Sequence, residues 1–223
     1  MDKAVLISIR SGWCWKIAEG KKTVELRKSR PHIDTPFRCY IYCTRATPLL
    51  AWKEMWTPDF KSLRAEVCGV SGHGREKAEK LFELFNGRVI GTFVCDKIDR
   101  LTHAGTMESS EPAKLCIETP DFQYESADEL LRAACMSEAI TEGYLKGGDG
   151  YGWHISDLKI YNQPKDIMCF HRAVEENELW CKKCAIGGKK DIHCAFCYGL
   201  DGLRLRRPPQ SWCYVAEQKE AEE

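Results

Sequence analysis

The sequence predicts an α+β fold in which a small β-sheet or barrel carries helices at its joints. About five strand-like segments are spread over the first 161 residues, and helical patterns lie between them. Because strands from distant parts of the chain must pair, a layered parallel sheet is the less favoured arrangement. A cysteine-rich segment after Gln163-Pro164 predicts an additional element that binds a metal ion.

The N-terminal elements have clear local signals. Residues 5–9 form an apolar run typical of a buried strand, and a helix is expected to begin at Ser11 as its N-cap. Gly20 stands where a helix ends in a C′ residue. Residues 23–27 then predict a short strand in which aliphatic and polar side chains alternate between the two faces.

The later elements are predicted by the same kinds of signal. Gly91 marks a possible bulge within its strand, and Ser126 with Glu129 forms a capping box that begins a helix. The expected segments are strands at 37–44, 89–98 and 151–161, a helix from 126 and a second short helix up to about 146.

We expect the chain to divide into three regions. Residues 1–170 form the main domain, with an irregular insertion at about 46–74. Residues 171–216 form a zinc-binding extension, and residues 217–223 form an acidic tail.

Composition narrows the class of protein. A chain of 223 residues with 43% hydrophobic residues is typical of a globular protein. No apolar run approaches the roughly 20 residues that a membrane-spanning helix needs. The first residues also lack the apolar core of a secretory signal, so we expect a cytoplasmic protein with no membrane partner.

The net charge is zero, but the charges are unevenly distributed. Residues 10–38 hold eight basic and three acidic side chains, and residues 182–207 hold seven and two. Residues 99–142 hold three basic and ten acidic side chains. This pattern is compatible with a surface that meets an anion on one side. The alternative, which clustering alone favours, is ordinary solvated surface.

The thirteen cysteines do not predict a disulfide framework. Their number is odd, and Cys39, Cys43 and Cys95 lie inside apolar strand-like segments, where a reduced cysteine acts as a small hydrophobic residue. Four others are paired by spacing. Two Cys-x2-Cys hooks, separated by nine residues, predict a structural Zn²⁺ site with four thiolate ligands and no open position for catalysis. The expected ligands are Cys181, Cys184, Cys194 and Cys197.

A second informative segment runs from Gly20 to Arg27, with the sequence Gly-Lys-Lys-Thr-Val-Glu-Leu-Arg. It places Lys22 at the junction of a helix and a strand, and Glu25 and Arg27 on one strand face. Such a group presents donors and an acceptor to a polar ligand such as a nucleobase or a phosphate. The alternative is an ion pair on a strand surface.

These residues resemble the opening of the ASCH domain, a relative of the PUA RNA-binding barrels. The resemblance rests on Ser8-Ile9-Arg10, Trp13, Ile17 and the Gly-x-Lys-x-x-Glu-x-Arg motif, and continues through segments 37–43, 91–96 and 151–158. The cysteine region resembles the zinc-bearing extension of phage-associated and bacterial members. One departure is Ser11-Gly12, where the family often has proline. The resemblance implies a PUA-like small β-barrel with a cleft around Lys22, Glu25 and Arg27.

Two functions follow from the resemblance. The first is an RNA- or nucleotide-binding module, in which Arg10, Lys22 and Arg27 meet phosphates or base edges and Glu25 accepts from an amino group. Trp13 or Trp153 would stack on a base. The alternative for each is core packing, which is favoured for either tryptophan taken singly.

The second function is hydrolysis. Some ASCH-like proteins resemble amidohydrolases that deacetylate N4-acetylcytidine, with a lysine base and a threonine nucleophile two residues before the motif arginine. Here that position holds Glu25, while Lys22 is retained, so these two residues would be the catalytic pair of an enzyme. Cleavage of RNA is a further variant.

The strand from Tyr151 contains polar residues that do not form an obvious catalytic unit. His154 and Asp157 alternate to opposite faces, and Ser156 shares a face with His154. We interpret this segment as a strand that closes the barrel.

Overall fold

The computed structural model describes residues 3–47, 83–104, 114–118, 126–173 and 203–218. The expected insertion at 46–74 lies almost wholly outside these residues. The described elements, in chain order, are β1 (Lys3–Ile9), α1 (Ser11–Ala18), β2 (Val24–Arg27), β3 (Phe37–Cys43), β4 (Val89–Cys95), β5 (Ile98–Ala104), β6 (Lys114–Ile117), α5 (Ala127–Ala133), α6 (Glu138–Leu145), β7 (Gly150–His154), β8 (Ser156–Lys165), η2 (Ile167–Cys169) and β9 (Trp212–Ala216).

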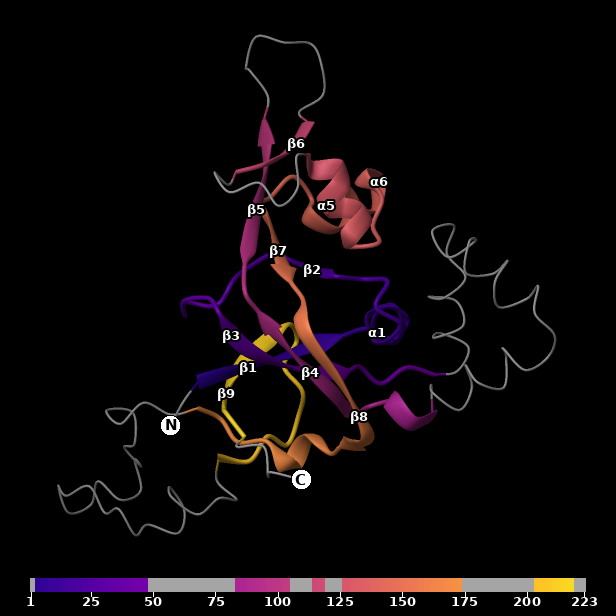
Figure 1. Ribbon diagram of the computed structural model, residues 1–223, viewed down its shortest axis with the longest axis vertical. Helices are drawn as coiled ribbons and strands as arrows, with labels where there is room; N and C mark the ends of the chain where they lie inside the picture. Colours follow the sequence, from indigo (N-terminus) through magenta and orange to yellow (C-terminus); the bar gives the residue numbers. More distant parts are fainter. Residues whose placement is uncertain (1–2, 48–82, 105–113, 119–125, 174–202, 219–223) are drawn as a thin grey trace, which may run out of the picture.

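The strands form two sheets, so the expectation of an α+β fold is confirmed. A five-stranded sheet has the order β8-β4-β3-β1-β9, and a four-stranded sheet has the order β2-β7-β5-β6. Only β1 and β3 pair in parallel; the other described pairs are antiparallel. In Figure 1 the α5–α6 pair lies beside the four-stranded sheet, away from β1 and β9.

The described strands do not close into the expected barrel. β2 and β6 border one sheet, and β8 and β9 border the other. The chain passes between the sheets at two short breaks, after β4 and again at Ile155 after β7. Each predicted long strand, 89–98 and 151–161, is therefore two strands in different sheets.

The structure confirms two of the local signals in the sequence, at Gly91 and Ser126, and corrects a third at the start of α1. The pairing of β4 with its neighbours shifts register around Gly91, where an added Cβ would collide with the carbonyl oxygen of Lys159. The Ser126 hydroxyl accepts from the backbone N–H of Glu129, as the capping box predicts. The expected N-cap was wrong, because Arg10 is the cap of α1 and makes no side-chain capping bond.

Part of the expected zinc-binding extension, the strand β9, belongs to the five-stranded sheet. β9 pairs antiparallel with β1 along Lys3–Ile7, and Arg172 bridges to Val215. Glu217, in the expected acidic tail, forms an ion pair with Arg38 at 2.8 Å. The described end of the chain is thus held by the N-terminal half of the molecule.

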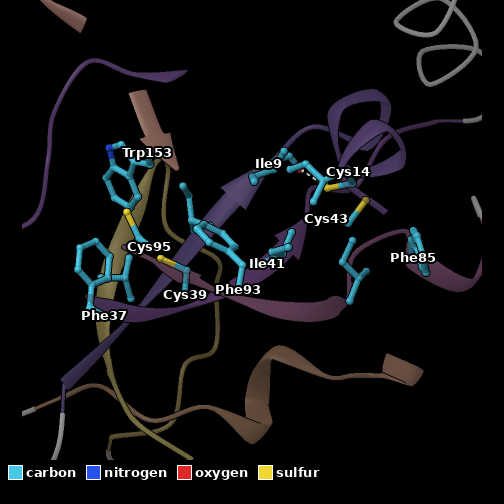
Figure 2. Packing of buried hydrophobic residues seen from close by; sticks show 14 residues of the cluster. Ile9, Cys14, Phe37, Cys39, Ile41, Cys43, Phe85, Phe93, Cys95 and Trp153 are labelled. Atoms are coloured by element: carbon cyan, nitrogen blue, oxygen red, sulfur yellow. Dashed lines mark hydrogen bonds between the residues drawn. The ribbon is translucent and has the colours of Figure 1, made fainter. Parts of the chain in front are cut away.

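The core is divided among three apolar clusters. One lies between the sheets and contains Trp153, Phe37 and Phe93 with four buried thiols. In Figure 2, Cys39 and Cys95 lie at the end with Trp153 and Phe37, and Cys14 and Cys43 lie at the other end of the cluster. A second covers the other face of the five-stranded sheet, and a third packs α5 and α6 on the four-stranded sheet. Cys39, Cys43 and Cys95 are buried free thiols, as predicted. No helix in the described ranges is long and apolar enough to cross a membrane.

Candidate ligand-binding site

The turn between α1 and β2 places Lys22 beneath the helix. Gly20 follows the C-cap residue Glu19 with a φ of 70°, a left-handed conformation that glycine adopts without steric cost. The backbone N–H of Lys22 then donates to the carbonyl of Lys16 at 3.1 Å. The chain folds back under α1, and Lys22 is only 2% exposed.

Glu25 lies between two cationic side chains. Its Oε2 is 3.3 Å from Nζ of Lys22, and its Oε1 is 3.0 Å from Nη2 of Arg27. Glu25 is 6% and Arg27 8% exposed, so this is a buried cluster and not a surface ion pair. Two cations face one carboxylate, which leaves one excess positive charge when all three groups are ionised.

Lys22 is held by neutral groups as well as by the carboxylate. Its Nζ donates to the backbone carbonyl of Ala134 at 2.7 Å and lies 5.0 Å from the ring centroid of Trp13. Burial lowers the pKa of Lys22 from its ordinary 10.5, and the charges of Glu25 and Cys135 oppose this shift. Removal from water disfavours the charged ammonium, while nearby negative charge favours it.

Not every buried polar atom of this cluster has a hydrogen-bond partner among the described residues. Nε of Arg27 has none, while Oε2 of Glu25 meets only the Lys22 ammonium, at the ion-pair distance of 3.3 Å. Nε1 of Trp153 is also buried without a partner among the described residues. Glu25 and Trp153 are directly opposite each other in the pairing of β2 with β7. Nη2 of Arg27, by contrast, donates to the carbonyl of Ser8 at 2.6 Å. The cluster is therefore fixed in place while one donor of Arg27 has no partner among the described residues, an unusual state for a buried polar atom.

The two candidate stacking residues have different environments. Trp13 is partly exposed and lies beside the Nζ atoms of Lys16 and Lys22, each 5.0 Å from its ring centroid. Trp153 is 0% exposed and packs between Phe37 and Trp212, with centroids 5.9 and 6.1 Å away. The structure thus favours core packing for Trp153. Arg10 is exposed at the start of α1.

Sequence reasoning missed Tyr144, which borders the cluster from α6. Burial raises the pKa of Tyr144, and the charges of Arg27, Glu25 and Arg10 also act on it. Its ring lies 5.1 Å from Nζ of Lys28. No local signal distinguishes this tyrosine, because it comes near β2 only through the packing of α6.

A second buried charge cluster was also missed. Nε2 of His154 is 2.6 Å from Oδ2 of Asp99, and Nζ of Lys97 is 3.1 Å from Oδ1 of the same carboxylate. His154 therefore pairs across strands with Asp99, while Asp157 is exposed. Ser156 donates to the carbonyl of Val94 at 2.9 Å and serves the backbone. No spacing rule could find a pair that is 55 residues apart.

The four cysteines of the expected zinc site lie outside the described residues. Within the described ranges, no group of three or more potential ligands is arranged to hold a metal ion. The zinc site therefore stays a prediction from the sequence.

Comparison with known proteins gives structural matches only. No family model matches the sequence, and no curated protein matches it. The fold is similar to a crystal structure of ASCH from Zymomonas mobilis, with 16% identity, a TM-score of 0.41 and coverage of 96% of this chain and 88% of that chain. Two mutants of the same protein are also similar. The tyrosine-to-phenylalanine mutant has 18% identity, a TM-score of 0.41 and coverage of 97% and 92%. The serine-to-alanine mutant has 16% identity, a TM-score of 0.40 and coverage of 96% and 89%.

These structures bear the family name that the Gly-x-Lys-x-x-Glu-x-Arg motif suggested, and the likeness extends over most of both chains. Identities of 16–18% and TM-scores near 0.4 carry no statement about function. The functional argument therefore depends on the cluster itself.

Proposed function

We propose that the protein binds RNA or a nucleotide at the Lys22–Glu25–Arg27 cluster. The observation that carries the proposal is the buried excess cation together with Nε of Arg27, which has no hydrogen-bond partner among the described residues. A buried charge without a full set of partners is costly, and an anionic group with polar edges supplies what this cluster lacks. A phosphate would balance the excess charge, and a base edge carries both donors and acceptors.

Trp13 supports the same class of ligand. A partly exposed indole beside two ammonium groups is a surface on which a base stacks while its phosphate meets a cation. Arg10 is exposed at the start of the same helix and offers a further phosphate contact. The resemblance of this segment to the ASCH domain points to the same ligands.

The test is direct binding at low salt. A labelled short single-stranded RNA and a mononucleotide are titrated with protein, and anisotropy and calorimetry report the affinities. We expect affinity that falls as salt rises, and about a tenfold loss in Lys22→Met, since a hydrogen bond to a charged group contributes about 1.5–3 kcal/mol. Absence of binding to every RNA and nucleotide at low salt would contradict the proposal.

Lys165→Met is the matched control for this loss. Lys165 also lies over an aromatic ring, 4.9 Å from the centroid of Tyr161, but in β8 of the other sheet. A general decrease of positive charge would weaken RNA binding equally in both variants. A site at Lys22 predicts that only Lys22→Met loses most of its affinity.

A second candidate function is hydrolysis of a modified nucleoside or of RNA. It is favoured by the lowered pKa of buried Lys22, because a lysine that releases its proton more readily is suited to general base catalysis. Incubation with N4-acetylcytidine and with short RNAs, followed by chromatography, tests it. Turnover that disappears in Lys22→Ala and in Glu25→Ala would establish an enzyme in place of a binding module.

We also propose a structural Zn²⁺ ion held by Cys181, Cys184, Cys194 and Cys197. The support is the spacing of two Cys-x2-Cys hooks, which suits a tetrahedral set of thiolates. Metal analysis of protein purified without added zinc should give about one zinc per chain. Occupancy well below half in folded protein would contradict this site.

A further inference from the structure

Residues 206–211, which we call the arginine segment, lead into β9 and lie against the end of β1. The hydroxyl of Ser8 donates to the carbonyl of Pro209 at 2.7 Å, and the backbone N–H of Ser8 donates to the carbonyl of Ser211 at 2.8 Å. Because β9 runs antiparallel to β1, beside which Figure 1 shows it, the segment continues past the end of β1. The arginine segment is therefore held at a defined place in the fold.

The same serine contacts the Lys22–Glu25–Arg27 cluster. The carbonyl oxygen of Ser8 accepts a hydrogen bond from Nη2 of Arg27 at 2.6 Å, and the same guanidinium nitrogen is 3.0 Å from Oε1 of Glu25. Ser8 is only 5% exposed, so this connection lies inside the protein. One buried residue thus joins the arginine segment to the proposed ligand site, and the segment lies next to that site.

Three chain segments that meet here contain basic residues and no acidic ones. Residues 8–18 have two Lys or Arg, residues 27–33 have three and residues 203–216 have three, and none of these segments contains Asp or Glu. The hydrogen bond from Nε1 of Trp212 to Oγ of Ser29, at 3.1 Å, connects the second segment with the third. Folding therefore brings the N-terminal and C-terminal basic regions together, and the net charge of zero conceals a local positive excess.

The cations of these segments are accessible to a ligand. Arg206 and Arg207 are exposed, and neither has an ion-pair partner among the described residues. Arg10 and Lys28 are exposed as well. The charge of Arg10 acts on Tyr144, whose ring lies 5.1 Å from Nζ of Lys28. We call these four cations the basic surface; it flanks the cluster both beside Tyr144 and at the arginine segment.

We propose that the basic surface holds the backbone of a single-stranded RNA, one nucleotide of which occupies the Lys22–Glu25–Arg27 cluster while Arg206 and Arg207 contact phosphates of its neighbours. This surface extends the proposed function and rests on it. Several exposed cations without acidic neighbours suit the repeated phosphates of a strand, and such contacts carry little sequence preference. A single strand is favoured over a duplex, because a base must leave its stack and its pair to reach a buried cluster.

RNA ligands of different length test this surface. The parent and a double variant, Arg206→Gln with Arg207→Gln, are titrated with a labelled single-stranded RNA of about eight nucleotides and with a mononucleotide. We expect the parent to bind the longer ligand about tenfold more tightly, and the double variant to lose most of this difference. Loss of two phosphate contacts should also decrease the slope of log affinity against log salt by about 1.4, at roughly 0.7 for each contact on a single strand.

The matched control removes the same charge at the opposite border of the sheet. Lys159 and Lys165 are exposed in β8, which lies at the far end of the five-stranded sheet from β9. The double variant Lys159→Gln with Lys165→Gln should keep the affinity for the longer RNA and the salt slope of the parent. Equal losses in the two double variants would show a general effect of charge and would overturn the proposal.

The remaining outcomes separate the basic surface from the site that it adjoins. If the parent binds neither the RNA nor the mononucleotide at low salt, the proposed function fails and this surface fails with it. If both ligands bind and depend on Lys22, but the Arg206 and Arg207 variant binds the longer RNA like the parent, only the basic surface is wrong. A duplex RNA of the same length that binds as tightly as the single strand would overturn the assignment to single-stranded RNA.

Discussion

The Lys22–Glu25–Arg27 cluster and the Lys97–Asp99–His154 cluster each contain a buried carboxylate between two basic side chains, although Lys97 itself is partly exposed. The two clusters differ in whether every buried polar atom has a partner. Asp99 contacts Lys97 through Oδ1 at 3.1 Å and His154 through Oδ2 at 2.6 Å. Glu25 also uses both oxygens, with Oε2 3.3 Å from Nζ of Lys22 and Oε1 3.0 Å from Nη2 of Arg27, but Nε of Arg27 has no hydrogen-bond partner among the described residues.

This difference separates a structural role from a binding role. Asp99 is 1% exposed, and its two short contacts join β5, β7 and the segment that precedes β5. Buried charge that is fully paired fixes a fold, whereas buried charge with unused atoms has capacity left for a ligand. The second cluster therefore serves as an internal control for the first.

The largest expected effect comes from removing either carboxylate. Asp99→Asn and Glu25→Gln should each destabilise the protein by about 3 kcal/mol, because the charged partners remain buried without their counter-charge. Urea unfolding with and without inorganic phosphate separates the two variants. Phosphate should recover stability in Glu25→Gln, where two cations are left together, and not in Asp99→Asn. Equal recovery in both would remove the distinction between the clusters.

Alkaline pH tests the buried thiols beside the clusters. Cys95 donates to the carbonyl of Lys97, and burial raises the pKa of Cys95 to about 12. Above pH 9 the unfolded chain loses this proton first, so stability falls between about pH 9 and 12, with a slope approaching about 1.4 kcal/mol per pH unit. In reducing buffer, Cys95→Ala should make the fall of the free energy of unfolding with pH less steep, by the contribution of one titrating thiol. The exposed Cys169→Ala is the control, and a profile unchanged in Cys95→Ala would contradict the assignment.

The two lysines should respond differently to removal of their charge. Lys97→Met leaves Asp99 with one partner fewer and should cost about 1 kcal/mol at neutral pH. Lys22→Met should cost clearly less than Lys97→Met in the same urea unfolding measurement, because it also removes a buried excess charge.

The pH dependence checks the origin of this difference. The pKa of Lys22 is lowered in the folded protein, so the unfolded chain keeps the proton to higher pH. The folded state therefore gains relative stability as pH rises from the lowered pKa of Lys22 towards 10.5. Urea unfolding across this range should show the parent gaining stability relative to Lys22→Met. If the parent instead lost stability relative to Lys22→Met as pH rises, the lowered pKa of Lys22 would be contradicted.

The smallest effect is expected at an exposed charge group. Arg100 pairs with Glu118 at 2.8 Å and with Asp149 at 2.7 Å, but all three side chains are exposed. Such pairs are screened by salt and weakly stabilising. Arg100→Gln should therefore be indistinguishable from the parent in urea unfolding at physiological salt. A loss as large as that of Asp99→Asn would show that burial is not what distinguishes these clusters.

Local sequence signals were sufficient for the frame of the binding site. The Gly20 helix end and the alternation of β2 place Lys22, Glu25 and Arg27 next to one another, and each signal acts over only a few residues. The register shift at Gly91 and the cap at Ser126 were found in the same way.

Only the tertiary structure decided how these residues are used. The sheet order makes β2 a neighbour of β7, so that Trp153 lies opposite Glu25 and His154 reaches Asp99. The end of α5 brings the carbonyl of Ala134 to Nζ of Lys22 across more than a hundred residues. Periodicity and spacing carry no information about such contacts, because they depend on which strands pair and which helix packs on them. The sequence by itself therefore determined the types and local order of the groups, and long-range packing determined that they are buried, paired or left with unused atoms.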